Sequence, residues 1–456
     1  MKKNRLCLTM FCLFIFISCC QAEAYVEHQA TRMNGNAALA ANANSGNGTK
    51  DDPYIIENWE IKYATTNARA GLRITNTTAF FIIKGCYIHD ISDSINKDMR
   101  GVNLEKVSNG TIMNCIIENV EYVGIQIENC VDIVVFNNEI KKNGGGGLIE
   151  VYNSSGINIE GNNIVDSKKD SVLVYEPYGK GVSVINNKLI GGGISDDGVE
   201  VNTCSKAITS EAITYMGEKT NMLIKGNYIS GHYSKGVEFN EHKVIGVIVA
   251  ENIFNGDHFS EDDSSGCEHK DALIVRNTFK NDARIILYFG ENFKIYENNF
   301  LDNTRVDDNG TNNIWYDVSK GRGNYWQECT IPDTNGDGVR DGTYTRNEGY
   351  FQGTIVDLYP LTAEFNPILQ RLLGDFGQKN QEIPDNKIDF EDLMWFTIYW
   401  NAYQANSSDI RADIAGSRET TSGQEPDLIT QKDGVVDFED LMIFTRMWNW
   451  YHKIYN

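Results

Sequence analysis

The sequence has few basic residues and, after its N-terminus, no long apolar run. Lys and Arg total 41 against 63 Asp and Glu, so the formal net charge is -22. This charge argues against a nucleic-acid partner, whose phosphates it would repel, and an anionic substrate would need a bridging cation. No segment after the N-terminus is apolar enough to be a transmembrane helix. The 456 residues suffice for one large folded domain and a smaller one.

The N-terminus has the three parts of a secretory signal. The basic stretch MKKNR precedes an apolar run over residues 6–17, and the small-residue motif AEA ends at residue 24. This pattern predicts a signal peptide over residues 1–24, so we expect a secreted protein, extracellular or at the cell surface. Lipid attachment at Cys19 is the alternative.

Short β-branched strands recur between residues 70 and 300, and each ends in a similar tag such as NNEI or GNYI. Successive tags are 21 to 40 residues apart. This period, without a helical pattern, indicates a β-solenoid with stacked parallel strands, in which asparagines at one turn form a hydrogen-bonded ladder. The aligned positions are Cys86, Cys115, Asn138, Asn162, Asn187, Asn227, Asn252, Asn277 and Asn298.

Six of the ten cysteines remain after removal of the signal, and none has CxxC spacing, which disfavours thiolate metal sites and redox motifs. Cys86 and Cys115 begin the predicted ladder on adjacent coils. A disulfide is barely possible at that spacing, so we favour buried free thiols.

Several segments together resemble the NosD family of secreted right-handed parallel β-helices. They are GTKDDPYIIENWEI, GNYW, DTNGDGVRDGTY and DLYPL, and the resemblance covers residues 48–362 after a polar segment, 25–47. It implies a right-handed parallel β-helix related in fold to polysaccharide lyases and hydrolases. The copper role behind the family name is not favoured, because the seven histidines are scattered and no His/Met cluster offers ligands.

Each coil also has a strand of the form Gly-Φ-x-Φ. Aligning these strands predicts that Asp170, Asp197 and Lys235 stack on three successive coils, with Glu200 over Glu238 three residues further along each strand. Asp196 lies at the turn. An insertion over residues 204–220 follows the Glu200 strand, where it could wall a groove.

Two chemistries fit this acidic patch. In the first, a calcium ion holds a uronate carboxylate and Lys235 removes the neighbouring proton, which starts β-elimination. This resembles the β-helix pectate lyases, and the resemblance implies that Asp170, Asp196, Asp197 and Glu200 bind the calcium. In the second, paired carboxylates among Asp197, Glu200 and Glu238 hydrolyse a glycosidic bond. The competing class is a non-catalytic glycan-binding or scaffold solenoid, in which Asp197 and Lys235 form a surface ion pair.

A DxNxDGxxD loop follows the coils. It places Asp333, Asn335, Asp337 and Asp341 at positions 1, 3, 5 and 9 of a calcium loop. Position 12 is Tyr344 instead of Glu. We expect calcium here with a structural role, and a calcium-free capping turn is the alternative.

Residues 363–456 form a separate unit with two copies of one motif, DNKIDFEDLMWFTIYWN and DGVVDFEDLMIFTRMWN, 48 residues apart. They resemble dockerin repeats, which implies a small α-helical domain, calcium loops and a cohesin-like partner. The aromatic stripe, such as Phe390, Phe396, Phe438 and Phe444, either packs the helices together, which we favour, or forms a cohesin-binding face. The candidate calcium ligands are Asp385, Asp389, Asp392, Asp433, Asp437 and Asp440.

Overall fold

The computed structural model describes most of the chain after the predicted signal. The described residues are 25–62, 69–93, 98–141, 146–167, 169–191, 197–202, 221–232, 235–240, 243–261, 268–346, 354–365, 374, 376, 388, 390–405, 412–414 and 435–455.

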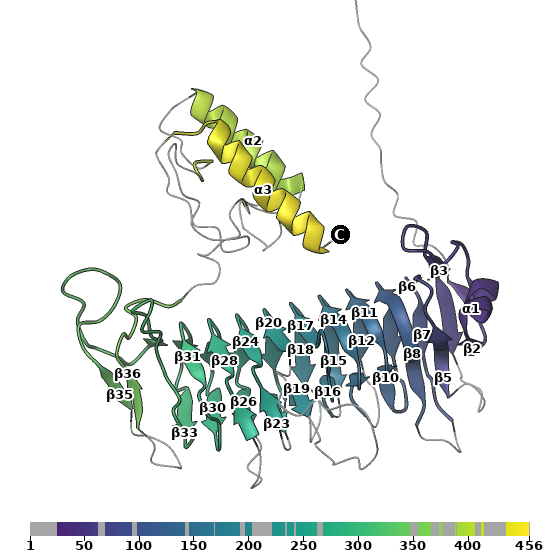
Figure 1. The fold of residues 1–456 in the computed structure, drawn as a ribbon, viewed down its shortest axis with the longest axis horizontal. Helices are drawn as coiled ribbons and strands as arrows, with labels where there is room; N and C mark the ends of the chain where they lie inside the picture. The colour runs from purple at the N-terminus through teal and green to yellow at the C-terminus, as the bar shows by residue number, and fades with distance from the viewer. Residues whose placement is uncertain are drawn as a thin grey trace, which may run out of the picture.

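Three parallel sheets, named A, B and C, run along a solenoid (Figure 1). Sheet A is 12-stranded. Its strands are β1 (Val26–His28), β4 (Trp59–Lys62), β7 (Tyr87–His89), β9 (Ile116–Glu118), β12 (Glu139–Lys141), β15 (Asn163–Ser167), β18 (Lys188–Gly191), β21 (Tyr228–Ser230), β25 (Ile253–Asn255), β29 (Thr278–Lys280), β32 (Asn299–Phe300) and β34 (Tyr325–Trp326).

Sheet B carries the predicted site. Its strands pair in parallel in chain order. They are β2 (Thr31–Asn34), β5 (Ala70–Thr77), β8 (Arg100–Met113), β10 (Val123–Glu128), β13 (Ile149–Tyr152), β16 (Val172–Tyr175), β19 (Asp197–Asn202), β22 (Lys235–Asn240), β26 (His258–Glu261), β30 (Arg284–Leu287) and β33 (Arg305–Asp308).

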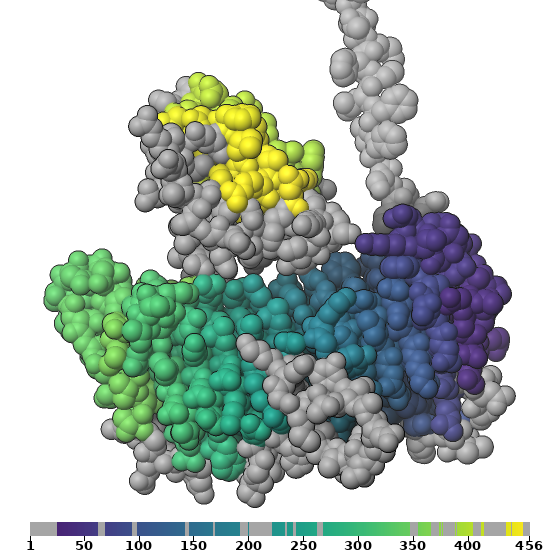
Figure 2. All heavy atoms as spheres, viewed as in Figure 1, coloured from purple at the N-terminus to yellow at the C-terminus, as the bar shows by residue number. Residues whose placement is uncertain are grey.

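Sheet C shares the long strand β8 with sheet B. A coil therefore runs through sheets B, C and A in turn, and Figure 2 shows successive coils in chain order from purple to green. The other strands of sheet C are β3 (Tyr54–Glu57), β6 (Phe81–Lys84), β11 (Val131–Phe136), β14 (Ser155–Glu160), β17 (Val182–Ile185), β20 (Met222–Lys225), β24 (Ile248–Ala250), β28 (Leu273–Val275) and β31 (Lys294–Tyr296).

The remaining elements lie outside these sheets. A short parallel pair is formed by β23 (Lys243–Ile245) and β27 (Glu268–Lys270). Strands β35 (Tyr344–Arg346) and β36 (Ile355–Asp357) pair antiparallel. The described helices are α1 (Asn36–Asn42), α2 (Phe390–Ala405) and α3 (Phe438–Tyr455), and none of these is long and apolar enough to span a membrane.

Alternating side chains fill the solenoid interior, because successive residues of a strand point to opposite faces. In β17, Val182 and Val184 are buried while their neighbours are partly exposed. Near the C-terminal end the core becomes aromatic: the rings of Phe254, Phe279, Phe300 and Trp326 stack at centroid distances of 4.6, 5.4 and 4.3 Å. This column buries much apolar surface, the main stabilising term in folding.

The asparagine ladder is confirmed. At a typical rung, the backbone N–H and the Nδ2 of Asn227 both donate to Asn252 Oδ1 at 2.9 Å, and Nδ2 also donates to the Val184 carbonyl at 2.8 Å. The Cys115 N–H donates to Asn138 Oδ1 at the start. The ladder continues beyond the predicted positions to Asn324, which accepts from Asn298. Each amide thus satisfies polar groups that would otherwise be buried without partners.

The cysteines of the described region are free and buried, as favoured from the sequence: Cys86, Cys115, Cys130 and Cys329. Contact with the Cys86 thiol, together with burial, raises the pKa of Cys115 well above its ordinary value. Such thiols are protonated and act as small core residues. Cys204 and Cys267 lie outside the described residues.

The solenoid begins earlier than residue 48. Strand β1 pairs with β4 and β2 pairs with β5, so the segment over residues 25–47 supplies strands to sheets A and B. Leu39 of α1 is fully buried in the solenoid core. The helix therefore covers apolar surface at the first coils, as the end of a solenoid requires.

At the C-terminal end, the carboxylate of Asp357 is fully buried and accepts hydrogen bonds from the Asn324 N–H, Trp326 Nε1 and the Tyr359 N–H. Burial raises the pKa of Asp357 from 3.8 to about 6 despite these bonds. The folded state therefore favours the protonated carboxyl more than the unfolded state does.

We expect this group to make the protein less stable as pH rises. Because the folded pKa lies above the unfolded value, its contribution is complete below about pH 4 and is lost by about pH 6, which amounts to roughly 3 kcal/mol. Urea unfolding between pH 4 and 7 measures this slope. In Asp357→Asn, which does not titrate, the slope should be smaller by that amount. Equal slopes in both proteins would contradict the assignment.

In the C-terminal unit, α2 and α3 share a small core. The rings of Phe396 and Phe444 stack 5.2 Å apart, and each residue is 2% exposed. The prediction that the aromatic stripe packs the helices together is confirmed for these residues. It is wrong for Phe390 and Phe438, which are 63% and 65% exposed, because they are the first residues of their helices, ahead of the contact.

Candidate functional site

The predicted columns on sheet B have the expected register. Asp197 is paired with Lys235, and Glu200 with Glu238, on the adjacent strands β19 and β22. Val172 of β16 pairs with Val199, which puts Asp170 level with Asp197 one coil earlier. The structure therefore brings these backbone positions together. Asp196 and the side chains of Asp197 and Glu200 lie outside the described residues.

Lys235 is in contact with a carboxylate of its own strand. Its Nζ donates to Glu238 Oε1, and the two side chains are 26% and 9% exposed. A carboxylate this close stabilises the charged ammonium and also fixes the position of the nitrogen. The lysine can act as a base only after it loses its proton.

The sequence alignment missed one strand of this face. Strand β13 places Glu150 in the same column, between Gln126 and Leu173. In the segment GLIEVY the glycine stands one residue earlier than the Gly-Φ-x-Φ pattern requires, so the pattern passed over it. The tags at Asn138 and Asn162 could have revealed this strand, since each coil contributes one strand to sheet B and two consecutive tags therefore need one between them.

Glu150 is a candidate proton donor. It is 2% exposed and accepts hydrogen bonds from the Gly147 N–H at 3.0 Å and the Tyr152 hydroxyl at 3.1 Å. Burial raises the pKa of Glu150 above its ordinary value. A carboxyl with a raised pKa holds its proton closer to neutral pH, which is the property a general acid needs.

Aromatic side chains flank Glu150. The rings of Tyr152 and Tyr175, on adjacent strands, lie 5.7 Å apart, and the Arg100 guanidinium lies 5.8 Å from the Tyr122 ring. Burial, and then the Glu150 charge, raise the pKa of Tyr152. Its hydroxyl is therefore a hydrogen-bond donor and not a base. Rings beside carboxyl and guanidinium groups give this face both apolar and polar contacts for a ligand.

A buried network links the coils beside the column. His232 Nε2 lies 3.0 Å from Ser171 Oγ, and its Nδ1 lies 2.6 Å from Asp257 Oδ2. Asp257 also accepts from the backbone N–H groups of Gly231 and His232. Serine, histidine and aspartate joined in this order by hydrogen bonds are the residues of a nucleophilic triad. No pattern in the sequence marks this network, because its members lie on three different coils.

Burial decides what this network does. Ser171 is fully buried, and the side chains of His232 and Asp257 are 0% and 3% exposed, so a substrate carbonyl has no access to the hydroxyl. Ser171 follows Asp170 directly, and His232 precedes Lys235 by three residues. The network therefore links the coil of Asp170 to the coil of Lys235 and helps to fix the spacing of these two positions of the column.

In the DxNxDGxxD loop, the candidate calcium ligands form hydrogen bonds within the loop itself. Asp333 accepts from the N–H groups of Gly336 and Gly338, and Asp341 Oδ2 accepts from Thr334 at 2.6 Å. Asn335 Oδ1 accepts from the Asp337 N–H at 2.9 Å. Within the described ranges no three His, Cys, Asp or Glu side chains converge to hold a metal ion. In this arrangement the loop residues therefore form an incomplete set of calcium ligands.

Two of the candidate calcium ligands in the C-terminal unit have a structural role. Asp392 Oδ1 accepts from the Phe376 N–H, and Asp440 Oδ1 accepts from the Ile414 N–H, both at 2.7 Å. Asp440 Oδ2 also accepts from the Asp437 N–H at 2.8 Å, in the first turn of α3. Buried carboxylates thus tie each helix to an earlier segment. Asp385, Asp389 and Asp433 lie outside the described residues.

Fold and site together define a parallel β-solenoid with a polar, aromatic-flanked column on one outer face. A family model described as a right handed beta helix region matches residues 17–189. This match indicates that the coil is right-handed, as the sequence predicts. No curated protein matches the chain.

Solved structures show likeness of fold. The A-module of the Azotobacter vinelandii mannuronan C-5 epimerase AlgE6 is 16% identical with a TM-score of 0.37, over 57% of this chain and 64%, less than two thirds, of that one. Pectate lyase Pel9A is 12% identical with a TM-score of 0.37, over 63% and 68%. The GH87 α-1,3-glucanase of Streptomyces thermodiastaticus strain HF3-3 is 11% identical with a TM-score of 0.39, over 65% and 63%.

Proposed function

We propose that this protein is a secreted polysaccharide lyase that binds a uronate-containing chain along the outer face of sheet B. The observation that carries the proposal is the register of Asp197 with Lys235 and of Glu200 with Glu238. It puts one lysine among carboxylate positions on a rigid sheet, and the aromatic residues near Glu150 lie further along the same sheet. Binding sites on stacked strands hold their side chains in fixed geometry.

In this reaction Lys235 takes the proton from the carbon next to the uronate carboxylate. The electrons of that C–H bond form a double bond in the ring, and the glycosidic C–O bond breaks. The leaving oxygen takes a proton from solvent, and Lys235 returns its proton to solvent. Glu238 orients the Lys235 nitrogen through their contact. Calcium would supply neutralisation of the substrate carboxylate, but no step is assigned to it, because the described residues do not show a converged site.

A specific observation favours a second candidate, an inverting glycoside hydrolase. Glu150 has a raised pKa, and Glu200 lies two strands further along the same column. The two backbone positions are therefore about 9.6 Å apart, while inverting enzymes hold their carboxyl groups about 6.5–9.5 Å apart. Glu150 would protonate the leaving oxygen, and Glu200 would activate water.

One experiment separates these functions. The mature protein is incubated with pectate, alginate and glycosaminoglycan chains, with calcium or with a chelator, and both products are followed. Ultraviolet absorbance from unsaturated sugar ends supports the lyase, whereas new reducing ends without that absorbance support the hydrolase. If neither appears across the panel, a glycan-binding or scaffold solenoid replaces both proposals.

We also propose calcium in the Asp333–Asp341 loop, on the order of its oxygen-bearing residues and the turn at Gly338, whose φ is 85°. If calcium binds only the folded state, about 100-fold excess over Kd stabilises the protein by about 2.7 kcal/mol and raises its melting temperature. Thermal melts with calcium and with chelator measure the shift. It should vanish in Asp337→Ala and persist in Asp51→Ala, an exposed acidic control; a shift retained in both variants would place calcium elsewhere.

A further inference from the structure

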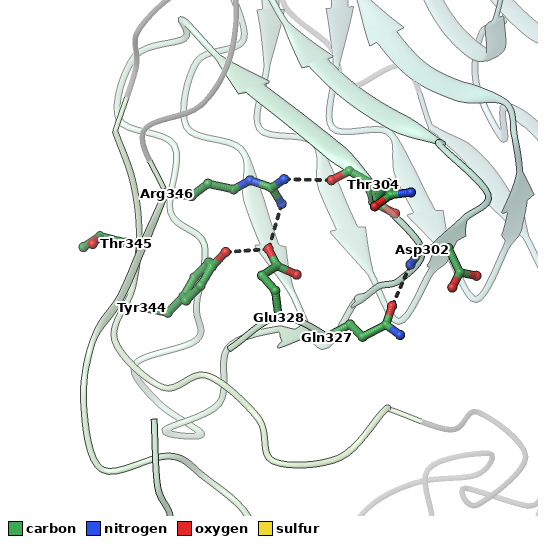
Figure 3. A pocket seen from close by; sticks show the side chains of 8 residues that line it. Asp302, Thr304, Gln327, Glu328, Tyr344, Thr345 and Arg346 are labelled. Carbon is green, nitrogen blue, oxygen red and sulfur yellow. Dashed lines mark hydrogen bonds and ion pairs between the residues drawn. The ribbon is translucent and has the colours of Figure 1, made fainter. Parts of the chain in front are cut away.

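A cavity lies near the C-terminal end of the solenoid, away from the column on sheet B. Its volume is about 590 Å³, and it is open to solvent. Figure 3 shows its lining, which comes from three segments distant in the chain. They are residues 302–304 after β32, residues 327–328 after β34, and strand β35.

The walls of this cavity are held by their own bonds. Arg346 donates to Glu328 Oε1 at 3.1 Å and to the Thr304 carbonyl at 2.9 Å, and the Tyr344 hydroxyl donates to the same Glu328 oxygen at 2.6 Å. Gln327 Oε1 accepts from the Asp302 N–H at 2.7 Å. The Tyr344 ring stacks on buried Trp326 at 4.8 Å, which anchors β35 to the core. The cavity is therefore preformed.

These bonds leave polar groups for a ligand. They use one oxygen of Glu328 and the amide oxygen of Gln327, so the second oxygen of Glu328 and the NH₂ group of Gln327, both lining residues, take no part in these wall bonds. The exposed side chains of Asp302 and Asn303 line the same space. Both donors and acceptors are present, which suits a ligand that carries many hydroxyl groups.

The size and charge of the cavity narrow the ligand class. Its volume lies within the range of small-molecule sites, and among the described residues that line it Tyr344 is the one aromatic side chain, which favours a polar ligand. Two carboxylates face one guanidinium, which disfavours an anion.

We propose that this cavity binds a unit of a neutral sugar chain. It is a site separate from the catalytic face, since three strand spacings of sheet B, about 14 Å, lie between β22 and β33. The proposal goes beyond the lyase function and does not depend on it. A chain held here would keep the protein on a mixed polysaccharide while the sheet-B face acts on another segment.

Isothermal titration calorimetry with cello-, xylo- and manno-oligosaccharides tests the proposal on the full chain. Gln327→Glu keeps the oxygen that accepts from Asp302 but removes the NH₂ donors and adds charge. We expect it to weaken binding of at least one neutral oligosaccharide by about tenfold or more, equivalent to about 1.4 kcal/mol. Lys235→Gln should bind that oligosaccharide as the natural protein does.

Three results would overturn the proposal: no binding of any neutral oligosaccharide, tighter binding of an anionic one in this cavity, or weakening by Lys235→Gln in place of Gln327→Glu. Thermal melts of both variants exclude unfolding as the cause. Gln327→Glu should retain any lyase activity, because Gln327 lies outside the sheet-B face. Cleavage and sugar binding are measured in separate assays, so a failure of the lyase proposal would not count against sugar binding in this cavity.

Discussion

Replacing Lys235 by Gln is expected to lower the rate of polysaccharide cleavage by about 10²- to 10⁴-fold, the usual contribution of a general base. The amide is neutral and cannot take the proton from the substrate carbon. Activity of the natural protein should rise toward alkaline pH, because only the neutral amine accepts a proton and a lysine is ordinarily charged at neutral pH. Initial rates of ultraviolet absorbance change on the responsive substrate measure both effects.

Lys243→Gln is the matched control. Lys243 lies on β23 and also pairs with a glutamate, Glu268, at 3.2 Å, with a side chain 32% exposed. It should keep full activity and melt close to the natural protein, since a part-exposed ion pair contributes about 1 kcal/mol at most. Thermal melts of both variants are needed, because Lys235→Gln removes the charged partner of the buried Glu238. Similar rate losses in both variants, or none in Lys235→Gln, would remove Lys235 as the base.

Asn227→Leu is expected to cause the largest loss of stability among single substitutions. Asn187 donates to Asn227 Oδ1 through its backbone N–H at 2.9 Å and through Nδ2 at 3.0 Å, and both donors would lose their acceptor. The Val184 carbonyl and Asn252 would each lose a donor. A buried polar group without a partner costs about 1–3 kcal/mol, so we expect a loss of roughly 3–6 kcal/mol.

The measurement is urea unfolding followed by circular dichroism, with hydrogen exchange to locate the loss. Because each coil contacts its neighbours only, exchange should increase most on the coils of Asn187 and Asn252. Asn309→Leu is the control: this asparagine is exposed, and its side chain donates one hydrogen bond, to the Tyr288 carbonyl at 3.3 Å. Equal losses in the two variants would mean that the ladder contributes no more than an exposed amide does.

Much of the solenoid could be predicted because its signals repeat. The asparagine tags set the coil period, and the parallel register then follows, so the pairing of Asp197 with Lys235 could be derived without coordinates. The alignment failed at Glu150, where the glycine of the pattern is displaced by one residue. It failed again at Phe390 and Phe438, because helical periodicity does not show where the contact between two helices begins.

By itself the sequence determined the repeat, the ladder and most of the residues that share a column, because a parallel solenoid converts spacing along the chain directly into stacking. Only the tertiary structure decided that Ser171, His232 and Asp257 meet in a sealed network, that Glu238 contacts Lys235, and that the walls around Glu328 close a cavity. The first and third of these join different coils or loops, the Lys235–Glu238 contact lies within one strand, and all depend on side-chain directions and burial. No spacing in the sequence encodes them, since they depend on how neighbouring turns pack.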